Sequence, residues 1–298
     1  MGNTQKNNRP KRKWRFGDRN DGRLLRTLDP MAKIAVYIMP NRNDACNFFR
    51  GSMDMTEVDS YVREKRAQGL KNFTSTHVFI AAYARTVSQR PALNRFIAGQ
   101  KVFQRYVFQV ELCIKKEMSL QGQESVITMD IPLDATAEQV YEIMEREVNT
   151  ARKETTDFDR LAKYIDYIPG LLKKFTVFSL RVADYFGLLP MWLKNLSPFH
   201  GSMFITSMAS LGIPAIYHHI YNFGNVPVFI SIGITEKKHV IDMDGNDRVR
   251  LMMDYTAVLD ERICDGYYYA SAFRYLTGVM RRPEQLDTPP EAIVEDID

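Results

Sequence analysis

The stretch Leu259-Asp260-Glu261-Arg262-Ile263-Cys264-Asp265-Gly266 is the most informative part of this chain of 298 residues. A largely apolar run from Arg248 to Leu259 precedes it, and Tyr268 to Met280 follows with helical periodicity. Glycine and aspartate favour a turn between the two runs. The stretch therefore predicts a strand, a tight turn that carries several charged residues, and a helix.

The rest of the chain alternates between predicted strands and helices. Apolar residues alternate with others from 106 to 115, which is the period of a strand with one buried face. Thr136-x-x-Gln139 is a capping box that opens a helix, and Asp244-Gly245 is a hairpin turn signal. Further helices are predicted over 31–39, 56–69 and 74–90, and further strands over 46–53, 125–131, 203–208 and 226–234. We expect an α/β fold of two layers (α+β), with a mixed central sheet covered by helices.

Charge divides the chain into a body and two tails. Residues 1–23 carry eight basic and two acidic residues, a net +6, so the other 275 residues carry 4 − 6 = −2. We expect 1–23 to be a basic flexible tail, 24–286 a single domain and 287–298 an acidic, mostly extended tail. Because the net positive charge is confined to a solvated arm, we do not expect nucleic acid as a partner.

The cysteines and the first residues indicate a reducing compartment. Cys46, Cys113 and Cys264 are an odd number without C-x-x-C spacing, which argues against a disulfide framework and a zinc site. The first twenty residues are polar and basic, so no secretory signal is expected. We expect a cytoplasmic protein without a bound metal.

The familiar catalytic motifs are missing. The sequence has no G-x-S-x-G, no Walker loop and no G-x-G-x-x-G, so hydrolase-elbow, P-loop and dinucleotide interpretations lose their main support. None of the five histidines has metal-ligand spacing with another histidine or a cysteine. A lone histidine of this kind is more often a structural or surface residue than a catalytic one. They are His77, His200, His218, His219 and His239.

The segment from Tyr164 to Pro198 is almost continuously apolar. Apolar residues recur at spacings of 4, 3, 4, 3 and 4 from Leu171 to Leu189, which defines one helical face. Lysines and arginines interrupt it too often for a spanning helix. Three interpretations stay open: a buried or oligomer-contacting insertion, a lid over an apolar site, and a helix on a membrane surface.

Two regions resemble one known family. Asp260, Arg262, Asp265 and Gly266 match the D-H-R-x-x-D-G signature of the 2-oxo acid dehydrogenase acyltransferase catalytic domain, whose core is shared with chloramphenicol acetyltransferase. Met203 to Ser207 is similar to the family's F-T-I-S strand. Thr56-Glu57-Val58-Asp59 and Pro91-Ala92-Leu93-Asn94 resemble its E-V-D and P-x-L-N motifs in the same order. The resemblance runs from about Met31 to Leu286 and implies a chloramphenicol acetyltransferase-like fold, with a helical insertion near 164–198.

The resemblance implies acyl transfer from a coenzyme A thioester to a thiol or hydroxyl, in a homotrimer whose sites lie between subunits. Ser207 stands where the family's serine or threonine donates a hydrogen bond to the oxyanion. Asp265 stands where an aspartate pairs with an arginine near the first helix and fixes the catalytic turn. Asp260, Arg262 and Gly266 inherit structural roles at the site.

The sequence departs from the family at the general base, because Glu261 replaces the motif histidine. Ala32 stands where the arginine is expected, with Lys33 beside it. A glutamate carboxylate, whose ordinary pKa is about 4.3, is a weak base unless burial raises that pKa. Glu261 is therefore either a retuned base or the mark of an inactive relative.

Two functions remain open, and a third property is compatible with both. The first is a CoA-dependent acyltransferase that uses Glu261 and Ser207 on an unknown small-molecule acceptor. The second is a catalytically inactive trimeric scaffold or ligand-binding module. Either one could also lie on a membrane surface through 164–198 and the basic tail. No lipoyl domain is visible in the sequence, so we do not expect membership of a dehydrogenase complex.

Overall fold

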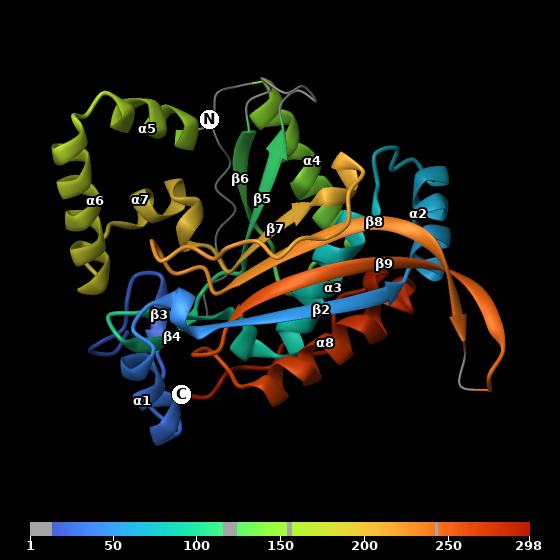
Figure 1. The fold of residues 1–298 in the computed structure, drawn as a ribbon, viewed down its shortest axis with the longest axis horizontal. Coiled ribbons are helices and arrows are strands. Elements are labelled where there is room, and N and C mark those ends of the chain that lie inside the picture. Colours follow the sequence, from blue (N-terminus) through green and yellow to red (C-terminus); the bar gives the residue numbers. More distant parts are fainter. Residues whose placement is uncertain (1–13, 116–123, 154–156, 242–243) are drawn as a thin grey trace.

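The computed structural model describes residues 14–115, 124–153, 157–241 and 244–298. Over these residues the main sheet has six strands: β2 (Cys46–Asp54), β5 (Gln109–Lys115), β6 (Glu124–Asp130), β7 (Met203–Ser207), β8 (Val228–Ile241) and β9 (Asp247–Asp260). Their order is β2-β9-β8-β7-β5-β6 (Figure 1). β7 is parallel to both of its neighbours, and the other adjacent pairs are antiparallel. The expected mixed sheet is confirmed.

Helices and a second sheet surround this centre. The helices are α1 (Pro30–Ile38), α2 (Thr56–Ala67), α3 (Ser75–Gln89), α4 (Ala137–Lys153), α5 (Asp157–Asp166), α6 (Gly170–Tyr185), α7 (Met191–Leu196) and α8 (Gly266–Met280). Single 3-10 turns are η1 (Arg42–Ala45), η2 (Pro91–Asn94), η3 (Pro198–His200), η4 (Met208–Leu211) and η5 (Pro283–Asp287). A small antiparallel sheet in the order β1-β4-β3 combines β1 (Gly22–Leu24), β3 (Arg95–Ala98) and β4 (Lys101–Arg105).

The main core lies between the sheet and the helices α2, α3, α4 and α8. Alternation along β7 divides its side chains between two faces: Met203 and Ile205 enter this core, whereas Phe204 enters a second cluster on the opposite face. There Phe204 stacks on Phe229, with ring centroids 5.0 Å apart. The helix layer therefore fixes the positions of β7 and β9, which carry the candidate site residues at their ends.

The described part of the basic tail does not behave as a flexible arm. Arg19 and Arg23 are buried, and Gly22–Leu24 forms β1 on the small sheet. Composition alone indicates a solvated segment, but these arginines have specific acidic and carbonyl partners. The expectation of flexibility is therefore wrong for 14–23, while 1–13 lie outside the described residues.

The acidic tail is irregular in backbone but packs against the body. The carboxylate of Asp296 accepts two hydrogen bonds of 2.6 Å from Arg95, and Arg23 donates to the carbonyls of Asp296 and Ile297. These contacts explain why an acidic, proline-containing segment is held in place: its partners are arginines distant in sequence.

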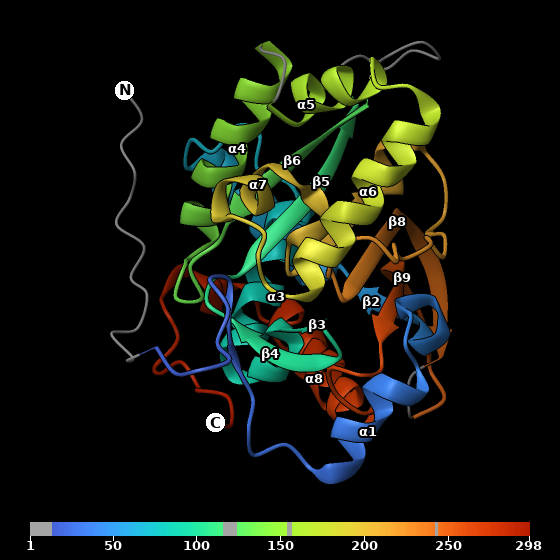
Figure 2. The ribbon, with the colours of Figure 1, turned by 90° about the vertical axis from the view of Figure 1, so that its left-hand side faces the viewer.

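The segment from 164 to 198 is helical, as its periodicity predicts, and forms most of an arm made of α5, α6 and α7. Figure 2 shows α6 standing beside the sheet with α5 above it. None of the residues of α6 is buried. Within the described ranges, no helix combines the length and the apolar character that crossing a membrane requires.

Candidate functional site

The turn after β9 is held by a buried ion pair. Asp260 has no exposed surface, and its carboxylate accepts hydrogen bonds of 2.8 and 2.7 Å from Nε and Nη2 of Arg262. Arg262 also donates to the carbonyl of Met39, 3.0 Å away. Arg42 approaches Asp260 from the other side at 3.5 Å. The two matched motif residues therefore have a structural role that joins the turn to the end of α1.

Arg42 and Arg95 complete the support of this turn, and sequence reasoning missed both. Burial lowers the pKa of Arg42 to about 10, against the opposing effect of Asp260. Arg42 donates to the backbone carbonyls of Tyr221 and Gly224, while Arg95 donates to the carbonyl of Ile263 at 3.0 Å. Nothing in the local pattern around either arginine indicates these long-range contacts.

Glu261 itself is exposed. Its backbone N–H donates to the carbonyl of Ala45 at 2.9 Å, which fixes the position of the residue. Its carboxylate has no hydrogen-bond or ion-pair partner among the described residues. The candidate base is thus held by its backbone while its side chain is left free.

Asp265 caps α8, with its carboxylate accepting a hydrogen bond of 2.8 Å from the backbone N–H of Tyr268. Within the described ranges it forms no ion pair with an arginine. Lys33 donates instead to the carbonyl of Arg26, so it does not supply the missing cation. The helix that begins at Gly266 is therefore fixed by a cap, and the arginine pairs belong to Asp260.

Ser207 ends β7 and is half-buried. Its carbonyl accepts a hydrogen bond of 2.7 Å from the hydroxyl of Ser210 in η4, and Gly212 then reverses the chain with a φ of 72°. Its own hydroxyl has no partner among the described residues. Like Glu261, Ser207 presents a free polar group at the end of a rigid strand.

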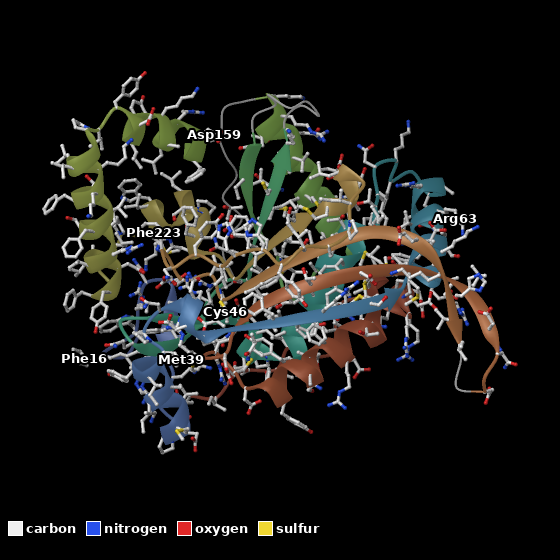
Figure 3. The ribbon with its side chains drawn as sticks, viewed as in Figure 1. Phe16, Met39, Cys46, Arg63, Asp159 and Phe223 are labelled. Carbon is white, nitrogen blue, oxygen red and sulfur yellow. The ribbon has the colours of Figure 1, made fainter. Side chains whose placement is uncertain are left out.

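The structure does not bring Ser207 and Glu261 together within one chain. Ser207 is level with Ile232 of β8, which is level with Tyr255 of β9. Glu261 lies six residues beyond Tyr255, which corresponds to about 20 Å along an extended strand. It follows Asp260, the partner of Cys46 at the start of β2 (Figure 3). One substrate carbonyl cannot contact both residues of the same chain.

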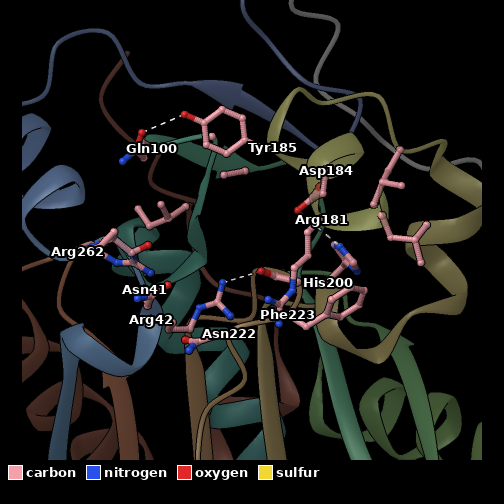
Figure 4. Close-up of a pocket in the computed structure, with 17 residues that line it drawn as sticks. Asn41, Arg42, Gln100, Arg181, Asp184, Tyr185, His200, Asn222, Phe223 and Arg262 are labelled. Atoms are coloured by element: carbon pink, nitrogen blue, oxygen red, sulfur yellow. Dashed lines mark hydrogen bonds and ion pairs between the residues drawn. The ribbon is translucent and has the colours of Figure 1, made fainter. Parts of the chain in front are cut away.

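A pocket of about 300 Å³ lies beside the turn. Arg42 and Arg262 line it from the body, and Arg181, Asp184 and Tyr185 line it from α6 (Figure 4). The hydroxyl of Tyr185 donates to Oε1 of Gln100 at 2.9 Å and ties the end of α6 to the body. The arm therefore forms one wall of the pocket, whereas Glu261 is not among its lining residues.

A buried charged cluster anchors the arm at this wall. Arg19 donates to the Asp184 carboxylate at 2.5 Å, and Nε2 of His200 lies 3.8 Å from the same carboxylate. Burial alone raises the pKa of Asp184, but His200 and Arg19 outweigh it and lower that pKa. Lys194 of α7 pairs with Asp21 at 2.8 Å. Two ion pairs thus fasten the arm to the residues just before β1.

The other sequence candidates are distributed over the fold. His77 is buried in α3, His239 is exposed beside Asp247, and His218 stacks on Phe229 with ring centroids 3.9 Å apart. Over the described ranges, no group of three or more histidine, cysteine or acidic residues is arranged to hold a metal ion. Among the described residues, Cys46, Cys113 and Cys264 are not joined in a disulfide.

Comparison with known proteins supports the fold through structure and not through sequence. No protein-family model matches the chain, and no curated protein matches it by sequence. The dihydrolipoamide acetyltransferase of Azotobacter vinelandii matches with a TM-score of 0.59 and 14% identity, covering 88% of this chain and 93% of that one. This chain has the fold of the CoA-dependent acyltransferases.

Two further structures agree with this assignment. A probable dihydrolipoamide acetyltransferase from Listeria monocytogenes matches with a TM-score of 0.58 and 15% identity, over 90% of this chain and 97% of that one. A chloramphenicol acetyltransferase matches with a TM-score of 0.52 and 10% identity, over 86% of this chain and all of that one, 100%. The expected fold is confirmed by these matches, and the identities show the fold alone.

Proposed function

We propose that this protein transfers an acyl group from a coenzyme A thioester to a small-molecule acceptor, at sites formed between the subunits of a homotrimer. The observation that carries the proposal is the separation of Ser207 and Glu261, two free polar groups at the ends of strands of one sheet and about 20 Å apart along it. A ring of identical chains can bring one end of a subunit to the other end of its neighbour. The structural relative from Azotobacter has a serine, a histidine and an asparagine in its catalytic mechanism.

Each residue has a defined role in the proposed reaction. The carboxylate of Glu261 accepts the proton of the acceptor's thiol or hydroxyl as the acceptor attacks the thioester carbonyl. The hydroxyl of Ser207 from the neighbouring subunit donates a hydrogen bond to the resulting oxyanion. Collapse of this intermediate breaks the carbon–sulfur bond, and the proton on Glu261 goes to the departing thiolate. Asp260 and Arg262 hold the turn, and Asp265 holds the following helix.

A second candidate is favoured by one specific observation. Glu261 is exposed in the single chain, and an exposed carboxylate is a weak base near neutral pH. In this alternative the trimer binds a ligand, or supports a partner, without catalysing acyl transfer. The pocket beside Arg262 and α6 is then the place where the ligand is held.

Thiol release from a panel of acyl-CoAs of different chain lengths distinguishes the two candidates. Thiol, alcohol and amine acceptors are supplied, and the wild type is compared with Glu261→Gln. We expect turnover in the wild type and a loss of about 100-fold in the variant, the usual contribution of a general base. Turnover that Glu261→Gln leaves unchanged would assign the base elsewhere, with His218 and His219 as the next candidates. No turnover in either protein, together with retained acyl-CoA binding by calorimetry, would favour the ligand-binding module.

A further inference from the structure

The outward face of α6 is an apolar stripe without a partner among the described residues. Leu171, Phe175 and Phe178 are exposed by 87%, 64% and 61%, and Val182 and Phe186 continue the same face. Side chains on the outer side of α6 project away from the body (Figure 3). Isolated exposed apolar residues are ordinary, but a continuous stripe along a helix marks an interaction surface.

The cations beside the stripe indicate what it contacts. Lys174 and Arg181 directly precede Phe175 and Val182, so each lies about 100° around the helix from the stripe. Both are exposed and, like Lys163 of α5, have no acidic partner among the described residues. The body behind them has the opposite sign: residues 14–298 carry 4 − 5 = −1, of which the arm, 157–196, contributes +2, so the remainder carries −1 − 2 = −3. An apolar stripe flanked by unpaired cations complements an anionic bilayer surface.

The segments on either side of α6 extend the same composition. Trp192 of α7 and Tyr167 between α5 and α6 are exposed by 63% and 84%. Amphipathic aromatic rings of this kind are enriched at the headgroup level of membranes. The inner face of α6 is tied down through Asp184 and Tyr185, so the helix is held parallel to the body with its apolar face outward.

We propose that the α5–α6 arm docks this protein on the surface of a membrane that contains anionic lipid. The phenylalanines and leucines of α6 enter the boundary between headgroups and acyl chains, and Lys163 and Lys174 contact lipid phosphates and carboxylates. The proposal is independent of acyl transfer, because it concerns only where the protein lies.

Flotation of the full chain with phosphatidylcholine vesicles that contain about 30% phosphatidylserine tests this proposal. We expect the wild type to float with these vesicles, and to float much less with pure phosphatidylcholine. Phe175→Ser with Phe178→Ser should lower the floated fraction about tenfold on both, since the apolar contact is lost. Lys163→Glu with Lys174→Glu should lower it on anionic vesicles only. Far-UV circular dichroism and the urea midpoint verify that each variant is folded.

Two controls separate the arm from other causes. Ile34→Ser with Ile38→Ser removes an exposed apolar pair from α1, and we expect flotation to stay unchanged. A chain that begins at Trp14 lacks the basic residues 1–13 and should still float through its arm. Flotation that depends on 1–13 but not on Phe175 and Phe178 would overturn the proposal, as would absence of flotation. If the wild type does not float, sedimentation of the Phe175→Ser, Phe178→Ser variant shows what the stripe contacts. A smaller oligomer in this variant than in the wild type would make the stripe a contact between copies.

Discussion

Asp260 is the residue on which the candidate turn depends most. Its carboxylate is fully buried and is held by Arg262 and, at a longer distance, by Arg42. Removing one partner of a buried pair leaves a charge that neither water nor protein can compensate. Burial of this ion pair therefore explains why an aspartate stands at 260 and an arginine at 262, whether or not Glu261 between them acts on a substrate.

Arg262→Met is expected to lower the free energy of unfolding by about 3–5 kcal/mol. Urea denaturation measures this loss, with Glu261→Gln as the matched control because its side chain has no partner to lose among the described residues. Adding Asp260→Asn to Arg262→Met should lower the stability further, since the buried Arg42 then loses the carboxylate of Asp260. Equal stability of wild type and Arg262→Met would refute this account of the turn.

His77 makes the stability of α3 depend on pH. Its Nδ1 accepts a hydrogen bond of 3.0 Å from the backbone N–H of Thr74, and burial lowers its pKa to about 4. The unfolded chain, with an ordinary value of 6.5, binds the proton more readily, so stability is complete above about pH 6.5 and falls as the pH drops toward 4.

His77→Gln keeps an acceptor for Thr74 but does not titrate. Between pH 7.5 and 5, we expect the wild type to lose about 2 kcal/mol more of its free energy of unfolding than this variant loses. Chemical denaturation at the two pH values gives the comparison. Identical pH dependence in both proteins would show that another group is responsible.

The sequence predicts the residues of the turn well, because Asp260, Arg262 and Asp265 lie within one short motif. It fails for Arg42 and Arg95, whose partners are more than 160 residues away. The sequence also does not predict that Asp265 caps α8 instead of pairing with an arginine. Contacts of this kind depend on how distant segments meet, which neither periodicity nor local motifs contain.

At the scale of elements, the connection before β8 is held by one constrained glycine. Gly224 has a φ of 72°, and its carbonyl accepts a hydrogen bond of 2.7 Å from Arg42. A side chain at this position would collide with the backbone carbonyl of Phe199. The backbone that lines one side of the pocket therefore requires a residue without Cβ.

Gly224→Ala should lower the free energy of unfolding by about 2–4 kcal/mol, through backbone strain and displacement of the 199–200 segment. The matched control is Gly245→Ala in the hairpin turn, which also has a positive φ, of 83°, but meets no atom within 4 Å. Its cost should be about 1 kcal/mol. Thermal or urea unfolding compares the two, and equal costs would show that the contact with Phe199 is easily relieved.

Predicted elements match the structure where the pattern is long and regular. The alternation in 106–115 and the capping box at Thr136 correspond to β5 and α4. The small sheet escapes prediction because β1 has three residues and β3 four, too few for a period to appear. The periodicity of α6 predicts its helical face, but periodicity alone does not show that the face points outward.

At the scale of the whole molecule, the separation of Ser207 and Glu261 makes a prediction about mixed assemblies. Ser207→Ala and Glu261→Gln chains should each retain about 1% or less of wild-type acyl transfer alone. When the two are unfolded together at equal amounts and refolded, about a quarter of the sites combine an intact Ser207 with an intact Glu261 from neighbouring chains. We expect about that share of wild-type acyl transfer to return.

Sedimentation of the mixture, and refolding of each variant alone, serve as controls for this experiment. No recovery of activity in a correctly assembled trimer would contradict a site shared between subunits. Each chain carries the same substitution before and after mixing, so a folding defect would persist in the mixture. Recovery of activity therefore shows that Ser207 and Glu261 act in the chemistry, which single substitutions alone do not show.

The arm is attached to the body at both of its ends. Asp184 and Tyr185 attach the last turn of α6, and the carboxylate of Asp159 in α5 accepts a hydrogen bond of 3.1 Å from Ser125 of β6. Between these ties runs the helix of 16 residues, about 24 Å long, which acts as a beam supported at its two ends. A force on its outer face is therefore passed to β6 at one end and to the pocket wall at the other. What the arm touches and what the pocket holds are thereby mechanically linked.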